Sequence, residues 1–134
     1  MSLNDTLKNV VNNVSGALGC GVVDLQSGML LGAYHSVPYF TQSFLDAVGA
    51  AAVDMIRGRN VVAVQKMIAT QRGVDKAPGF TEIQMTSENT YHFVSVVPGK
   101  PNALVILITS KQTNLGMGWA GLRQALPEIA PKCP

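Results

Sequence analysis

The sequence contains few charged residues. Of its 134 residues, 13% are Asp, Glu, Lys or Arg, against roughly 25% in a typical soluble domain. Apolar residues make up 47%, and the mean hydropathy is +0.22. Monomers rarely leave large apolar patches open to water, so we infer that such a patch is covered by another subunit or a partner. A monomer with a core unusually rich in Ala and Val is the alternative.

Concentrated charge and long apolar runs are also absent. The ten basic and eight acidic residues are scattered and give a net charge of +2, so no basic stripe exists to bind nucleic acid. Each apolar run ends before the roughly 18 residues that a membrane span needs. Met1–Thr6 lacks a basic region leading into an apolar segment. We expect no nucleic acid partner, no membrane insertion and a cytoplasmic location.

Reactive side chains are sparse. The sequence has two cysteines, Cys20 and Cys133, and two histidines, His35 and His92, with no Cys-x-x-Cys or His-x-x-x-His spacing. Cys20 is flanked by two glycines in an expected strand, which favours a small inert side chain over a nucleophile. The sequence therefore predicts no catalytic residue, no metal and no cofactor. A small enzyme that uses Cys20 or His92 is kept as an alternative.

Hydrophobic periodicity predicts a single domain over residues 1–134 in the order helix, two strands, helix, three strands, helix. Ser2 or Asn4, Thr41, and Thr113 or Asn114 are the expected helix caps. The helices are expected at about 3–15, 42–57 and 114–129, and the strands at 17–25, 29–34, 80–86, 91–97 and 103–108.

The segment between the second helix and the third strand is harder to assign. Gly58 interrupts the helical pattern, and Asn60 can cap a new start, so residues 61–70 form either a separate helix or a bent continuation. Residues 71–79 carry two glycines, a proline and three charges, which predicts the most mobile loop of the chain.

Short turns between the strands predict hairpins and thus a five-stranded antiparallel sheet. The strand Ala103–Ile108 is apolar without interruption. Such a strand belongs at the centre of a sheet with both faces covered, here by helices on both faces. The expected class is an α/β (α+β) sandwich of the profilin-like type.

Three stretches carry a resemblance to a known family. They are Gly16–Asp24 followed by Ser27–Gly28, the small-residue stretch Ala47–Ala52, and Asn114–Gly116 after the last strand. Together with the order of elements they make the whole chain similar to the roadblock family of dynein light chains and their bacterial relatives. The departure is the segment 58–79, which is longer than a minimal member needs.

The resemblance implies a non-catalytic homodimer in which the second helices pack together and the third strands pair at their edges. Bacterial relatives regulate Ras-like GTPases, so a small GTPase or another protein is the implied partner. Arg57 and Arg59 are candidates to contact that partner. The candidate dimer interface comprises Phe44, Val48, Ala52 and Met55 on the second helix and Phe80, Glu82 and Gln84 on the third strand.

A second reading of the same architecture is a small-molecule sensor. In that reading the sheet and helices enclose a small apolar molecule near Tyr91, Phe93 and Trp119. Trp119 as an ordinary core residue is the default interpretation.

Overall fold

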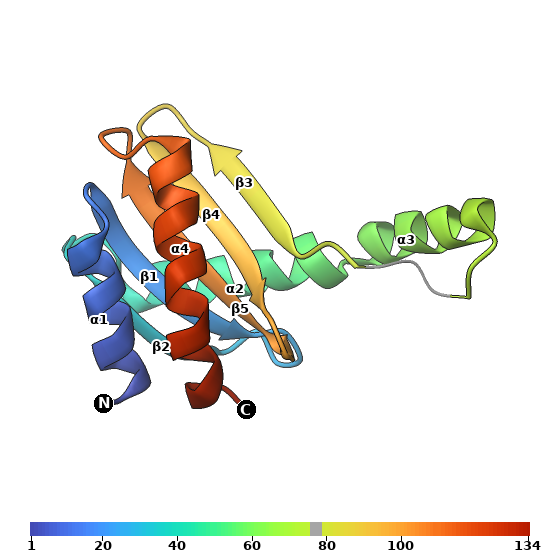
Figure 1. The fold of residues 1–134 in the computed structure, drawn as a ribbon, viewed down its shortest axis with the longest axis horizontal. Coiled ribbons are helices and arrows are strands. Elements are labelled where there is room, and N and C mark those ends of the chain that lie inside the picture. Colours follow the sequence, from blue (N-terminus) through green and yellow to red (C-terminus); the bar gives the residue numbers. More distant parts are fainter. Residues whose placement is uncertain (76–78) are drawn as a thin grey trace.

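The computed structural model describes residues 1–75 and 79–134. It confirms the expected order of elements and adds one helix, α3, after the second (Figure 1). The elements are α1 Leu3–Asn13, β1 Ala17–Asp24, β2 Leu30–His35, α2 Gln42–Arg57, α3 Arg59–Arg72, β3 Glu82–Thr86, β4 Thr90–Val97, β5 Lys100–Ser110 and α4 Leu115–Ile129, followed by the short 3-10 helix Ala130–Lys132.

The five strands form one antiparallel sheet in the order β2-β1-β5-β4-β3. β5 lies at its centre, and seven consecutive residues of this strand, 103–109, are buried. A strand can bury every residue only when both faces of the sheet are covered, because successive side chains point to opposite faces. The predicted central position of this strand is therefore confirmed.

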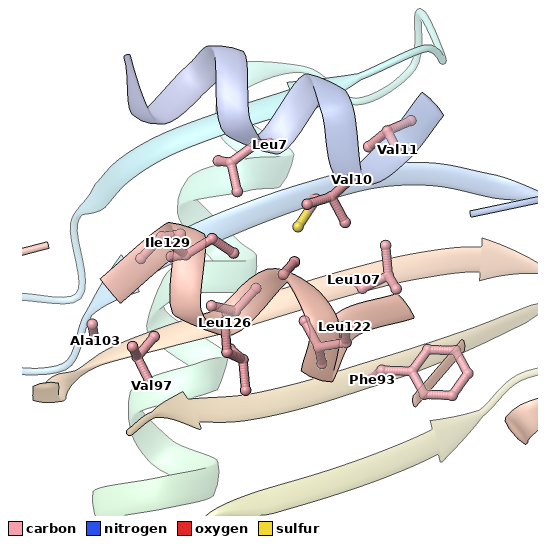
Figure 2. Close-up of a cluster of buried hydrophobic side chains, with 14 of the residues drawn as sticks. Leu7, Val10, Val11, Phe93, Val97, Ala103, Leu107, Leu122, Leu126 and Ile129 are labelled. Atoms are coloured by element: carbon pink, nitrogen blue, oxygen red, sulfur yellow. The ribbon is translucent and has the colours of Figure 1, made fainter. Parts of the chain in front are cut away.

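Helices cover both faces, as predicted. α1 and α4 lie side by side on one face, and α2 crosses the other (Figure 1). The core under α1 and α4 contains Leu7, Phe93, Leu107, Leu122 and Ile129, which Figure 2 shows converging between the two helices and the sheet. A second core under α2 takes the alternate residues of β5 together with Ala52 and Ile56.

Three helix starts are capped by residues that the sequence indicated. Ser2 accepts a hydrogen bond from the Asp5 amide in a full capping box, Thr41 accepts from the Phe44 amide, and Asn114 accepts from the Met117 amide. The cap expected from Asn60 is wrong. α3 begins at Arg59, two residues earlier than a cap at Asn60 would allow, because Gly58 stands in extended conformation and is both the C-cap of α2 and the N-cap of α3.

α3 is a separate helix rather than a bent continuation of α2. It runs past Thr70 and ends at Gly73, whose positive φ of 68° suits a residue without a side chain. It projects from the body of the domain beyond the β3 edge of the sheet (Figure 1). Of the predicted loop 71–79, residues 76–78 lie outside the described part of the chain. Among the residues described, no helix is long and apolar enough to cross a membrane.

Candidate functional site

The outer edge of β3 is open. Thr81 accepts a hydrogen bond from the Val96 amide at 2.8 Å, and the Ser87 amide donates to Thr90 at 2.9 Å. Since bonding alternates along an antiparallel strand, the odd-numbered residues between them face β4 and the amides of Glu82 and Gln84 face outward. In the part of the chain that the structure describes, β4 is the only strand that pairs with β3. Its outward backbone groups are therefore free to pair with another strand.

The opposite edge of the sheet, β2, is closed by the chain itself at one outward amide, that of Ala33. The Ser36 amide donates to Leu18 at 3.0 Å, which places the Ala33 amide on the outward side. The side-chain carbonyl of Asn4, in α1, accepts a hydrogen bond from that amide at 3.0 Å. Gly32 permits the approach, because a Cβ at this position would collide with Asn4 and Leu3.

The helix α2 crosses the sheet against β1 and β2, ends near the open edge (Figure 1) and presents an outer face rich in alanine. Its exposed residues in the middle of the helix are Asp46, Ala47, Ala50, Ala51 and Asp54. The predicted interface stripe lies about a quarter turn away from that face. Phe44 is 38% exposed and stacks on Phe40, whereas Val48 and Met55 are half-buried against the core under α2.

The prediction that Ala52 is part of that interface stripe is wrong. Ala52 is fully buried within its own subunit, so it cannot reach a second copy. The apolar pattern of α2 is wide enough to cover more than half of the helix surface, and its centre, at Gly49, Ala52 and Ile56, faces the sheet. The sequence pattern located this apolar face but could not say which of its flanks stays open to solvent.

The predicted strand residues lie at the open edge. Phe80 is 43% exposed just before β3. The side chain of Glu82 turns toward α4, where Arg123 donates two hydrogen bonds to its carboxylate at 3.0 and 2.8 Å. These bonds lower the pKa of Glu82 below its usual value. The side chain of Glu82 is thus held within its own subunit, while its backbone amide stays available.

The two arginines predicted to bind a partner differ. The Arg57 guanidinium donates to the Pro101 carbonyl at 2.9 Å and to the Asn102 side chain at 2.6 Å, so it anchors the start of β5 in its own chain. Arg59 is exposed at the start of α3. Sequence reasoning could not find the role of Arg57, because its partners lie more than forty residues away.

The reactive side chains are buried or engaged. Burial raises the pKa of the Cys20 thiol to about 12, which removes the thiolate at neutral pH. Cys133 is also a free, buried thiol. The His92 ring bonds to the Thr90 hydroxyl at 2.9 Å, and burial lowers the pKa of His92. Among residues 1–75 and 79–134, no three His, Cys, Asp or Glu side chains gather as a metal site would need.

The expected sensor pocket is filled by the protein itself. Phe93 is fully buried and packs edge-on against Trp119, with ring centroids 5.3 Å apart. A Cβ at Gly118 would collide with the Phe93 ring, which shows how closely α4 approaches it. Trp119 is half-buried there, in line with its default interpretation. A cavity under α2, lined by Tyr34, His35 and others, measures only about 30 Å³, room for about one water molecule.

The element order, the sheet topology and the helices on both faces are those of a roadblock domain, as the sequence resemblance predicted. No family sequence model and no curated protein sequence matches this chain. Solved structures do match. A Roadblock/LC7 domain from Streptomyces avermitilis is 12% identical with a TM-score of 0.71, and the match covers 98% of this chain and 97% of that one.

The bacterial proteins MglB and MglC share the fold. The gliding protein MglB from Thermus thermophilus is 19% identical with a TM-score of 0.72, over 98% of this chain and 87% of that one. MglC from Myxococcus xanthus is 23% identical with a TM-score of 0.58, over 96% and 97%. One MglB structure is described as a tetrameric arrangement. At these identities the likeness shows that the chain has the roadblock fold.

Proposed function

We propose that this chain is a non-catalytic homodimer that acts as a regulator or scaffold for another protein, with a Ras-like small GTPase as the candidate partner. The observation that carries the proposal is the difference between the two sheet edges. β2 is closed by Asn4 at the Ala33 amide, and β3 is left open near the end of α2, whose outer face is rich in alanine. An unpaired edge invites pairing with another chain unless it is protected.

Pairing between two copies of β3 satisfies that edge. Identical antiparallel strands become neighbours in a continuous sheet through a two-fold axis perpendicular to the sheet. That axis uses the same residues on both sides and keeps the two α2 helices on the same face. The outward amides of Glu82 and Gln84 would then bond to their counterparts, and the low charge of the sequence agrees with a covered surface.

The GTPase assignment is supported by the resemblance to the bacterial relatives and by the shared fold of MglB and MglC. A dimer of this kind acts by binding. It shifts its partner toward one conformation only as far as its affinities for the two conformations differ. Arg59 is the exposed basic residue that remains a candidate to contact the partner. A cytoplasmic location is part of the proposal.

The first test is the solution mass by light scattering across a dilution series. For the wild type we expect a mass near twice 14.2 kDa. The Phe44→Asp variant should dissociate to the monomer at concentrations where the wild type stays dimeric. Leu31→Asp is the matched control, since Leu31 is also 38% exposed but lies on the closed edge strand β2. A wild-type monomer at every concentration would refute the dimer.

The partner is tested separately. The dimer is titrated with a Ras-like GTPase from the same organism, loaded with GDP or with a non-hydrolysable GTP analogue. We expect binding that differs between the two nucleotide states. Equal affinity for both nucleotide states would agree with a scaffold and exclude a regulator, because a protein that binds both states equally cannot shift the equilibrium between them.

A further inference from the structure

α3 carries an apolar face that is only partly covered by the described residues of its own chain, with Val61 and Ile68 half-buried and Val64 and Met67 exposed. Val61, Val64, Met67 and Ile68 lie along one side of the helix at spacings of three, six and seven residues. Val64 is 46% exposed and Met67 is 62% exposed. Ala69, on the other side of the helix, is buried, and the Val74 amide caps the helix end by donating to the Ala69 carbonyl at 3.0 Å.

The position of α3 points to the covering surface. α2 runs across the sheet toward the β3 edge, and α3 continues beyond that edge into space that no described element occupies (Figure 1). A two-fold axis at this edge reverses the direction of α2. The α2 helix of the second copy would therefore lie beyond the β3 edge, antiparallel to α3. The two helices match in length, at about 21 Å for α3 and 24 Å for α2.

Charge and shape match as well. α3 carries Arg59, Lys66 and Arg72 and no acidic residue. The exposed side of α2 carries Asp46 and Asp54 as its only acids, and its outer face of Ala47, Ala50 and Ala51 leaves room for a second helix. Phe44, near the start of α2 and to one side of this face, adds an aromatic ring that is 38% exposed. Complementary charge of this kind fixes register in an interface more than it adds affinity.

We propose that the apolar face of α3 docks along the α2 helix of a second copy of this chain, so that each subunit holds the other with an arm. This docking rests on the proposed dimer through β3. It adds a second contact that begins where the β3 pairing ends. It also explains why the segment 58–79 is longer than a minimal roadblock domain needs.

Engineered disulfides test the docking. Ala47→Cys is combined with Met67→Cys and, one helical turn further on, with Gln71→Cys, while the native Cys20 and Cys133 stay buried. A bond within one chain is excluded, because α3 leads away from α2 (Figure 1), the ten residues of α2 after Ala47 already span about 15 Å, and a disulfide needs Cα atoms within about 7 Å. We expect at least one double variant to form a linked dimer on oxidation, and every single variant to stay unlinked.

The outcomes separate the two proposals. If no double variant links while light scattering still shows a dimer, the docking of α3 is refuted and the β3 dimer stands. If the wild-type chain is a monomer at all concentrations, the proposed function fails and the docking fails with it.

A charge on the apolar face supplies a second measurement. Met67→Asp is expected to raise the dimer dissociation constant about tenfold or more, because it buries a carboxylate. Thr70→Asp, on the opposite side of α3, is the matched control and should change it by less than about twofold. Equal effects of the two variants, or no effect of either, would overturn the docking.

Discussion

The two edge strands of this sheet, β2 and β3, differ in whether their outward backbone amides have a hydrogen-bond partner. At β2, the side chain of Asn4 accepts the hydrogen bond of the outward Ala33 amide, and α1 lies against the strand. At β3, the outward amides of Glu82 and Gln84 meet no strand or side chain in the described part of the chain. The difference teaches that the chain supplies its own hydrogen-bond partner at one edge of this sheet and leaves the other edge without one.

One open edge and one closed edge have a structural consequence. A sheet with two open edges can extend without limit, whereas a sheet with one open edge closes after a single pairing across a two-fold axis. The comparison between β2 and β3 thus predicts a dimer rather than a fibre, and four substitutions break or sharpen it.

The largest effect is expected from removing the cover over β2. Leu7 in α1 is fully buried, so Leu7→Ala should lower the free energy of unfolding by about 2–5 kcal/mol through a cavity. Chemical denaturation measures the loss. Leu115→Ala, at an exposed leucine of α4, should change it by less than about 0.5 kcal/mol. Similar losses for both would mean that α1 is not an integral part of the closed side.

The next effect concerns the open edge itself. Gln84→Pro removes an outward amide but no bond to β4, and proline is tolerated on an edge strand in that orientation. We expect the subunit to stay folded while the dimer dissociation constant rises about ten- to a hundredfold, because two symmetric hydrogen bonds are lost. Light scattering and circular dichroism check the two parts. Gln84→Ala keeps the amide and should leave the dimer intact; an unchanged dimer in the proline variant would contradict pairing at this edge.

A third substitution opens the closed edge. Asn4→Ala removes the acceptor of the Ala33 amide and should cost about 1 kcal/mol of stability. Hydrogen exchange at Ala33 should accelerate, and higher oligomers should form at high concentration because both edges are then free. Asn12→Ala, at an exposed position of the same helix, is the control. If exchange at Ala33 does not change, Asn4 does not protect this edge.

The smallest effect concerns the ion pair beside β3. The pKa of Glu82 is lowered by the Arg123 hydrogen bonds, so its contribution is present at neutral pH and is lost as the pH falls through the lowered value. Glu82→Gln should cost about 0.2–1 kcal/mol at pH 7, since both side chains are partly exposed. At a pH below the lowered pKa the cost should vanish. Glu88→Gln, in the exposed β3–β4 turn, is the control, and a cost that persists in acid would exclude the ion pair as its source.

Much of the fold could be predicted from the sequence because its signals are local. The period-two and helical patterns, the caps at Ser2, Thr41 and Asn114 and the apolar run Ala103–Ile108 each depend on neighbours in the chain. The error at Asn60 also has a local cause. Gly58 already ends α2 and starts α3, so no separate cap is needed.

The candidate site was less predictable because its properties depend on distant residues. The sequence located the apolar face of α2 but placed the buried Ala52 on the surface. Arg57 was predicted to bind a partner, and its hydrogen bonds to the start of β5 were not foreseen. Asn4 was considered only as a helix cap, and nothing in the sequence pairs it with Ala33, 29 residues later.

By itself, the sequence determined the elements, their antiparallel order and the central place of β5, since hydrophobic periodicity and turn chemistry act over a few residues. It also determined that too little charge is present to cover the surface. Only the tertiary structure decided which sheet edge is closed, which side of α2 faces outward and where α3 projects. These depend on contacts between residues far apart in the chain, which no local pattern encodes.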